Sequence, residues 1–407
     1  MKNEVVIQAG EEETLDYVDG NLHLKRHAKV KGKGESPKLR VSGNIYCDGK
    51  NILDCSVSAK SLEAEDDVTV RGDLEIEDGI EVEDGKLEVE GNLKAEHVNV
   101  DNALYVEKNL EAKSVDVGGS LKVDGNVEAE TIDVGGSFRA KGKVKAETVD
   151  VGGSLKMYSE AEIDRMKVGG AAKVAGGKIR EIDVGGVFES EGRIEFEKID
   201  VGGVARIIGD ENKGGNINVG GKLEVKGNFS FEEIEVGGVT HIRGNCEGNN
   251  IEVGGKMKAG GSIKLTGDIE VGGKLEAESE VSAKNIDVGG ILHAKRVSAK
   301  DHVEVGGSVE TEEGVNAKFF RIGKRGKVYG PIRADKVIIG KEARVEDIYG
   351  KEILLRYEAR ARNVYGEIVR IESGCRIDGE VKYTRELRID EHVRLEKPPQ
   401  KVDKLPL

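Results

Sequence analysis

The sequence predicts an all-β fold, a single-stranded, triangular parallel β-helix with about 17 residues per turn and about 20 turns. The tripeptide Val-Gly-Gly occurs twelve times between Val117 and Gly307, at intervals of 16 to 18 residues. Within each unit apolar and polar residues alternate, as they do along strands. The composition agrees, because 57 of the 407 residues are glycine, 4% are aromatic and none is tryptophan. Such a chain has few of the bulky side chains that fill a conventional globular core.

Each repeat unit contains three pairs of apolar residues. In residues 132–149 these are Ile132 with Val134, Phe138 with Ala140, and Val144 with Ala146. Three short strands separated by corners therefore form one turn. A helical repeat is excluded, because the units lack a 3.6-residue stripe and carry two glycines each. A propeller blade would need about 40 residues.

The paired glycines are predicted to form structural corners, where the backbone needs a positive φ or a close approach to a neighbour. The corner residues named by this pattern are Gly118, Gly119, Gly135, Gly136, Gly152, Gly153, Gly185, Gly186, Gly237 and Gly238.

The pattern predicts four segments along the chain. Residues 1–40 form an N-terminal cap segment with a basic stretch, and residues 41–317 form an acidic β-helical shaft with the Val-Gly-Gly repeats. Residues 318–390 form basic C-terminal β-helical turns. Residues 391–407 form a polar, proline-containing tail, since the adjacent Pro398 and Pro399 cannot join a sheet.

Charge is unevenly distributed over these segments. The net charge is −14, which argues against nucleic acid as a partner. Residues 41–317 carry −22, whereas residues 318–376 carry 15 basic and 8 acidic side chains. Two interpretations remain open: solvated faces that keep a long molecule soluble, or basic ends that are attracted to acidic shafts or anionic surfaces.

No pattern of catalytic or metal-ligating residues stands out. The four cysteines are scattered and form no CxxC pair, and the seven histidines are dispersed. Walker, HExxH and GxSxG motifs are missing. The sequence therefore predicts no enzyme, no catalytic residue, no cofactor and no metal site. Without an apolar run or a signal peptide, a cytoplasmic location is expected.

One acidic column is a candidate for binding divalent cations. It precedes the Val-Gly-Gly valines and consists of Asp116, Asp133, Asp150, Asp183, Asp200, Glu235, Glu252, Glu270, Asp287 and Glu304. Calcium β-rolls use a nine-residue glycine-aspartate pattern that this chain lacks. Plain surface charge is the favoured interpretation.

The turns from Val115 to Val309, together with Arg321 to Pro406, resemble the bactofilins, a family of polymer-forming cytoskeletal proteins. The second segment contains RIGKRGKVYGPIRADKVIIGKEARVEDIYG, IESGCRIDGEV and KPPQKVDKLP. The resemblance implies a right-handed β-helix that assembles end to end into filaments without nucleotide. Two features differ from typical members: the repeat region is longer, and no membrane-targeting peptide is evident at the N-terminus. The second difference disfavours direct membrane binding.

The favoured hypothesis is a structural protein whose partners are other copies of itself, with room for protein clients. Its end turns leave unpaired backbone groups, so a polymerisation interface is predicted near Val369, Ile371, Ile377 and Val381. The alternatives are a β-helical enzyme, either a hexapeptide-type acyltransferase or a sugar-active one, and a capped monomeric scaffold.

Overall fold

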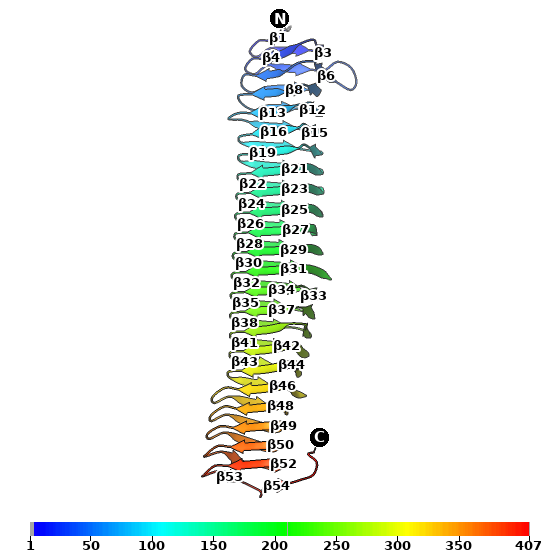
Figure 1. The fold of residues 1–407 in the computed structure, drawn as a ribbon. Helices are drawn as coiled ribbons and strands as arrows, with labels where there is room; N and C mark the ends of the chain where they lie inside the picture. Colours follow the sequence, from blue (N-terminus) through cyan, green and yellow to red (C-terminus); the bar gives the residue numbers. More distant parts are fainter. Residues whose placement is uncertain (1–3, 210, 407) are drawn as a thin grey trace. The chain divides into compact units, whose positions relative to one another are not determined.

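The computed structural model describes residues 4–209 and 211–406, and among these every regular element is a β-strand. The chain divides into two compact units, Met1–Gly202 and Gly203–Leu407. In each unit the strands stack as successive turns of a parallel β-solenoid (Figure 1). There are about 23 turns of ~17 residues, which confirms the predicted fold class.

The strands of the first unit are β1 (Glu4–Ile7), β2 (Glu12–Thr14), β3 (Tyr17–Val18), β4 (Asn21–Leu24), β5 (Lys29–Lys31), β6 (Lys38–Val41), β7 (Ile45–Cys47), β8 (Asn51–Asp54), β9 (Ser56–Ala59), β10 (Leu62–Ala64), β11 (Val68–Val70), β12 (Leu74–Ile76), β13 (Gly79–Val82), β14 (Lys86–Val89), β15 (Leu93–Lys94), β16 (His97–Val100), β17 (Ala103–Val106), β18 (Leu110–Glu111), β19 (Ser114–Val117), β20 (Ser120–Val123), β21 (Val127–Val134), β22 (Ser137–Ala140), β23 (Val144–Val151), β24 (Ser154–Met157), β25 (Ala161–Val168), β26 (Ala171–Val174), β27 (Gly177–Val184), β28 (Val187–Ser190) and β29 (Ile194–Val201).

The strands of the second unit are β30 (Val204–Ile208), β31 (Asn212–Val219), β32 (Lys222–Lys226), β33 (Phe229–Ser230), β34 (Glu233–Val236), β35 (Val239–Ile242), β36 (Cys246–Gly248), β37 (Asn250–Val253), β38 (Lys256–Ala259), β39 (Ile263–Leu265), β40 (Asp268–Val271), β41 (Lys274–Ala277), β42 (Glu280–Val288), β43 (Ile291–His293), β44 (Arg296–Val305), β45 (Ser308–Glu310), β46 (Gly314–Ile322), β47 (Lys327–Tyr329), β48 (Ile332–Ile339), β49 (Arg344–Leu355), β50 (Arg360–Ile371), β51 (Arg376–Ile377), β52 (Val381–Ile389), β53 (Arg394–Leu395) and β54 (Gln400–Lys401).

A turn has three sides, which we name face A, face B and face C. Face A contains the strand segments that end at the Val-Gly-Gly corners and their counterparts in the other turns, such as β19 and the second half of β21. Face B follows those corners, as β20 does, and face C is the third side. Each segment pairs in parallel with the one a turn later, as Val117 of β19 does with Val134 of β21.

Inward positions form continuous apolar columns, because every second residue of a strand points into the turn. In the turn of β19 to β21, the six inward side chains are between 0 and 8% exposed; they are Val115, Val117, Leu121, Val123, Val127 and Ala129. Identical spacing in the next turn places Ile132 over Val115. The pairs of inward residues expected from the sequence are therefore the core.

The Val-Gly-Gly corners require glycine because the backbones of neighbouring turns approach closely. A Cβ on Gly118 would lie 2.2 Å from the carbonyl oxygen of Asp101, and one on Gly135 would lie 2.2 Å from that of Gly118. The same clash, at 2.6 Å or less, would occur at the other corner glycines named above. None of these ten has a positive φ. Of the two reasons considered from the sequence, close approach is the one that applies.

A second set of corners, between faces B and C, is joined by an asparagine ladder that the sequence analysis missed. The Oδ1 atom of Asn92 accepts a hydrogen bond from the backbone N–H of Asn109 at 3.2 Å, and Asn109 does the same for Asn126 at 2.9 Å. Asn126 continues the ladder to the N–H of Lys143. The signal in the sequence was asparagine recurring at intervals of 17 residues.

The turns begin and end closer to the termini than expected from the sequence. Parallel pairing starts with β1 and β4, where Glu4 lies opposite Asn21. Residues 32–37 between β5 and β6 loop out from the stack (Figure 1). At the other end β53 and β54 lie in the segment expected to be a polar tail. The additional turns explain why about 23 are found where about 20 were predicted.

Candidate functional site

The first unit carries a groove of about 970 Å³ along the corner where face C meets face A. Its floor is a column of small side chains with one alanine per turn: Ala95, Ala112, Ala129 and Ala146. The larger Ile76 and Ile163 take the same position at the two ends of the column. A groove forms here because the alanine methyl groups fill less of the corner than the larger side chains of Ile76 and Ile163 at the two ends of the column.

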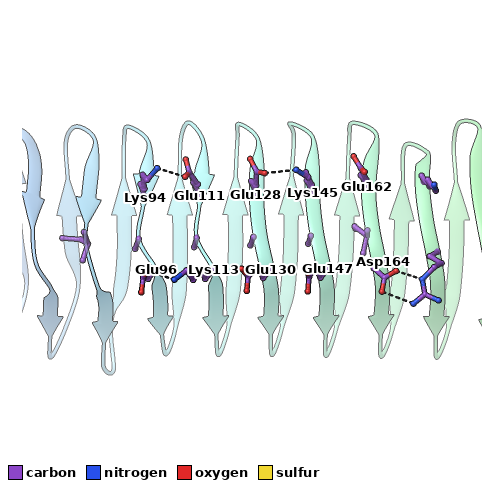
Figure 2. A pocket seen from close by; sticks show the side chains of 18 of the residues that line it. Lys94, Glu96, Glu111, Lys113, Glu128, Glu130, Lys145, Glu147, Glu162 and Asp164 are labelled. Carbon is purple, nitrogen blue, oxygen red and sulfur yellow. Dashed lines mark hydrogen bonds and ion pairs between the residues drawn. The ribbon is translucent and has the colours of Figure 1, made fainter.

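Charged residues before and after each alanine form the two walls of the groove. Figure 2 shows ion pairs that join neighbouring turns along both walls. On one wall Lys94 donates to Glu111 at 2.6 Å, and Lys145 donates to Glu128 at 3.0 Å. The pairs on the other wall are Lys113 with Glu96 and Arg180 with Asp164.

The two ion pairs of the second wall stabilise the charged forms of their members. The hydrogen bond from Lys113 lowers the pKa of Glu96, and the same bond raises the pKa of Lys113. A hydrogen bond from Arg180 likewise lowers the pKa of Asp164. General acid–base catalysis needs groups that titrate near the working pH. The groove therefore has the chemistry of a charged contact surface, and its lining residues include no histidine, cysteine or serine.

The histidines that contact other side chains do so at separate places along the chain. His97 contacts the Ser114 hydroxyl at 2.7 Å, and His302 contacts Asp287 at 3.0 Å. His23 lies 2.7 Å from Asp48, beside Lys25. Over residues 4–209 and 211–406, no three His, Cys, Asp or Glu side chains are grouped so that they could hold a metal ion.

All four cysteines are free and buried. Burial raises the pKa of Cys47 and of Cys246 to about 12, and that of Cys55 and of Cys375 to about 11. Thiols held in the neutral form are poor nucleophiles. They act here as small apolar side chains of the inward columns.

Of the four predicted interface residues, Val369, Ile371 and Ile377 lie one turn inside the C-terminal end, and Val381 lies in β52 itself. Val369, Ile371, Ile377 and Val381 are each at most 1% exposed. The chain itself covers three of them, since Val369 lies opposite Leu387, Ile371 opposite Ile389, and Ile377 opposite Leu395. In the single chain these four residues are buried, and other residues form the exposed surface at this end. The sequence analysis did not predict that β53 and β54 continue the parallel stack beyond β51 and β52.

The exposed C-terminal edge is the part of β52 from Glu386 to Ile389. This segment pairs with β50 on one side, and β54 covers only Lys382 and Tyr383 on the other. Ile389 is 39% exposed, and Leu387 and Leu395 are half-buried. These three inward-column residues are what the terminal turn presents to solvent.

The N-terminal edge of the first unit is similar. Strands β1, β2 and β3 pair with β4, β5 and β6, and no described strand lies on their other side. Val5, which lies opposite the fully buried Leu22, is 37% exposed. Each end therefore combines unpaired strand edges with partly exposed core side chains.

An open strand edge is the structural requirement for polymerisation by strand pairing, and the sequence comparison gives a matching result. A family model for bactofilins, polymer-forming cytoskeletal proteins, matches residues 63–162. The matched residues run from within β10 into β25 and include most of the residues that line the groove. It overlaps the first stretch on which the resemblance was based and does not include residues 321–406. No curated protein and no solved structure matches the chain.

Bactofilins are a structural, polymer-forming cytoskeletal family, and the match to it covers about a quarter of this chain. Within the part of the chain that the structure describes, no helix has the length and apolarity needed to cross a bilayer.

Proposed function

We propose that this protein is a structural element of a cytoskeleton, whose copies join end to end into filaments by β-strand pairing and without nucleotide. The observation that carries the proposal is the pair of open edges, at Glu386–Ile389 in the second unit and at β1 to β3 in the first. An unpaired edge leaves N–H and C=O groups that a further strand can satisfy. The bactofilin match to residues 63–162 supports polymer formation.

The interface of this proposal consists of the edge residues rather than the layer beneath them. Leu387, Ile389 and Leu395 would continue the inward columns into the next molecule, as Val369 and Ile371 continue them within the chain. Joining would bury the exposed part of these side chains, which favours association by roughly 25 cal/mol per Å² of apolar surface.

The test is a double substitution, Leu387→Lys with Ile389→Lys, examined by negative-stain microscopy and sedimentation. We expect loss of filaments with circular dichroism unchanged, since the two side chains lie at the edge. Glu235→Lys, an outward change far from either edge, is the control and should leave filaments intact. Long filaments formed by the double variant, or loss of filaments in the control, would contradict end-to-end joining.

Nucleotide independence has its own experiment. The sequence contains no phosphate-binding loop motif, and the charged groove is lined by twice as many carboxylates as cations. Sedimented polymer should be equal with and without ATP, GTP and magnesium. Polymer that forms only after nucleotide is added would overturn this part of the proposal.

A further inference from the structure

Face A of the second unit changes character over its last five turns. We name the outward residues of the five turns from β34 to β44 the acidic stretch: Glu233, Glu235, Asn250, Glu252, Asp268, Glu270, Asn285, Asp287, His302 and Glu304. We name those of the next five turns, from β46 to β52, the mixed stretch: Phe319, Arg321, Lys336, Ile338, Glu352, Leu354, Ile368, Arg370, Glu386 and Arg388.

The two stretches are opposite in charge. The acidic stretch has seven carboxylates, no lysine or arginine and no apolar side chain. The mixed stretch has four cations, two carboxylates and four apolar side chains. Phe319, Ile338, Leu354 and Ile368 are half-buried although they point outward. In a strand whose inward side is already filled, outward apolar residues are not required by the fold.

Several charges in both stretches have no ion-pair partner in the described residues. In the mixed stretch these are Lys336 and Arg370, whereas Arg321 pairs with Glu304 at 3.6 Å. In the acidic stretch Glu235, Glu252 and Glu270 are equally unpaired. The adjacent corner column differs, because Lys318, Lys351 and Arg385 each pair with a carboxylate of a neighbouring turn. Face A therefore has unpaired charges that could bind another molecule, whereas the three corner cations are already paired within the chain.

We infer that the mixed stretch is a lateral contact surface whose partner is the acidic stretch of a second copy of this chain. Both stretches repeat at the turn spacing of about 4.8 Å, so cations on one copy can lie opposite carboxylates on the other. An anionic bilayer is a poorer partner, because the seven carboxylates lie on the same face within the next five turns and would be repelled. A second copy can be offset along the face to avoid like charges.

The contact surface of one molecule is small, but its repetition along a filament strengthens the binding between two filaments. Five turns of four residues cover about 24 Å by about 13 Å, well below the ~800 Å² per partner of a stable dimer. Repeated along two filaments, many weak contacts act together. The inference therefore rests on the proposed function for its strength, and it adds the side-by-side pairing of filaments.

The test is reversal of the two unpaired cations, Lys336→Glu with Arg370→Glu. We expect wild-type filaments to pair side by side at low salt and to separate near 0.5 M salt, where the Debye length is about 4 Å. The variant should form single filaments of normal length at every salt concentration. The matched control, Lys318→Glu with Lys351→Glu, makes the same charge change in the corner column and should pair as the wild type does.

Restoring the pairing with a second, complementary variant is the more specific part of the experiment. Filaments of the Lys336→Glu, Arg370→Glu variant should pair again when mixed with a Glu252→Lys, Glu270→Lys variant, which alone should also stay single. Unchanged pairing in the first variant, or no rescue in the mixture, would overturn the inference. If the Lys336→Glu, Arg370→Glu variant does not pair and wild-type chains sediment with phosphatidylserine vesicles, the surface is a membrane contact. That outcome would also overturn the inference.

Filament length reports the proposed function and filament width reports the lateral contact, so the two can fail separately. If the wild type forms no filaments, salt-sensitive binding of wild-type chains to beads densely coated with the same chain still tests the surface. Binding to the beads that is lost in the Lys336→Glu, Arg370→Glu variant supports the inference. Equal binding by that variant contradicts it.

Discussion

The acidic and mixed stretches of face A share a backbone and an inward core, yet their outward side chains have little in common. Val253 and Val271 in the first stretch, and Ile339 and Leu355 in the second, are all at most 1% exposed. The outward residues between those columns change from Glu252 and Glu270 to Ile338 and Leu354. Inward residues are therefore fixed by packing, and outward residues are free to determine what the surface contacts.

The strongest test of this comparison replaces an inward residue by a charge. Ile234→Asp buries a carboxylate in a position that is 0% exposed, and it should cost roughly 3–5 kcal/mol of unfolding free energy. The next residue, Glu235, points outward, so Glu235→Lys should change stability by less than about 0.5 kcal/mol. Thermal unfolding followed by circular dichroism measures both. Equal melting temperatures would break the comparison.

The cysteines test the inward columns without changing the sequence. Burial raises the pKa of Cys47 and of Cys246 to about 12, so both remain protonated at pH 8. Their reaction with a thiol reagent should be at least about a hundredfold slower than that of an exposed cysteine. The rate should become ordinary in denaturant. Fast labelling of the folded protein would show that these positions are open to solvent.

Corner glycines sharpen the comparison, because they are neither inward nor outward residues. Gly135→Ala places a Cβ 2.2 Å from the carbonyl oxygen of Gly118 and should cost about 2 kcal/mol. Gly79→Ala is the control, since its Cβ would meet no atom nearer than 3.7 Å. Denaturant unfolding measures the difference. A Gly135→Ala variant as stable as the control would show that the corners can open without cost.

The smallest effect is expected on the outward acidic column of the first unit. Burial, and then the charges of Asp116 and Asp150, raise the pKa of Asp133 above its ordinary value. Ionisation of Asp133 therefore opposes folding at neutral pH, and the wild type regains this stability as the pH falls through the raised pKa. Asp133→Asn should stabilise the protein at pH 7 by less than about 1 kcal/mol.

The control for this prediction is Asp200→Asn. Asp200 forms an ion pair with Lys198 at 2.5 Å, so removing the Asp200 carboxylate should give no gain in stability. The advantage of Asp133→Asn over the wild type should shrink below about pH 4. A gain from Asp133→Asn that is the same at pH 4 and pH 7 would contradict the electrostatic explanation.

Much of the candidate site could be predicted only in outline. The sequence indicated that the ends carry unpaired edges, and it named residues close to one of them. It did not show which turn is the last of the stack, so it did not place Leu387 and Ile389 of β52 over Val369 and Ile371. The groove was also missed: Ala95, Ala112, Ala129 and Ala146 recur every 17 residues, but alanine at an inward position does not by itself predict a groove.

The sequence by itself determined the fold class, the turn length and the identity of the inward residues. These properties are one-dimensional: an alternation of period two and a repeat of 17 residues can be counted along the chain without knowing any contact. Only the tertiary structure decided which outward side chains lie side by side. Turns vary by one or two residues, so the register of each pairing must be known before Phe319, Ile338 and Arg370 can be placed on one face. The physical reason is that a core selects its residues by burial at every turn, whereas a surface depends on how successive turns stack.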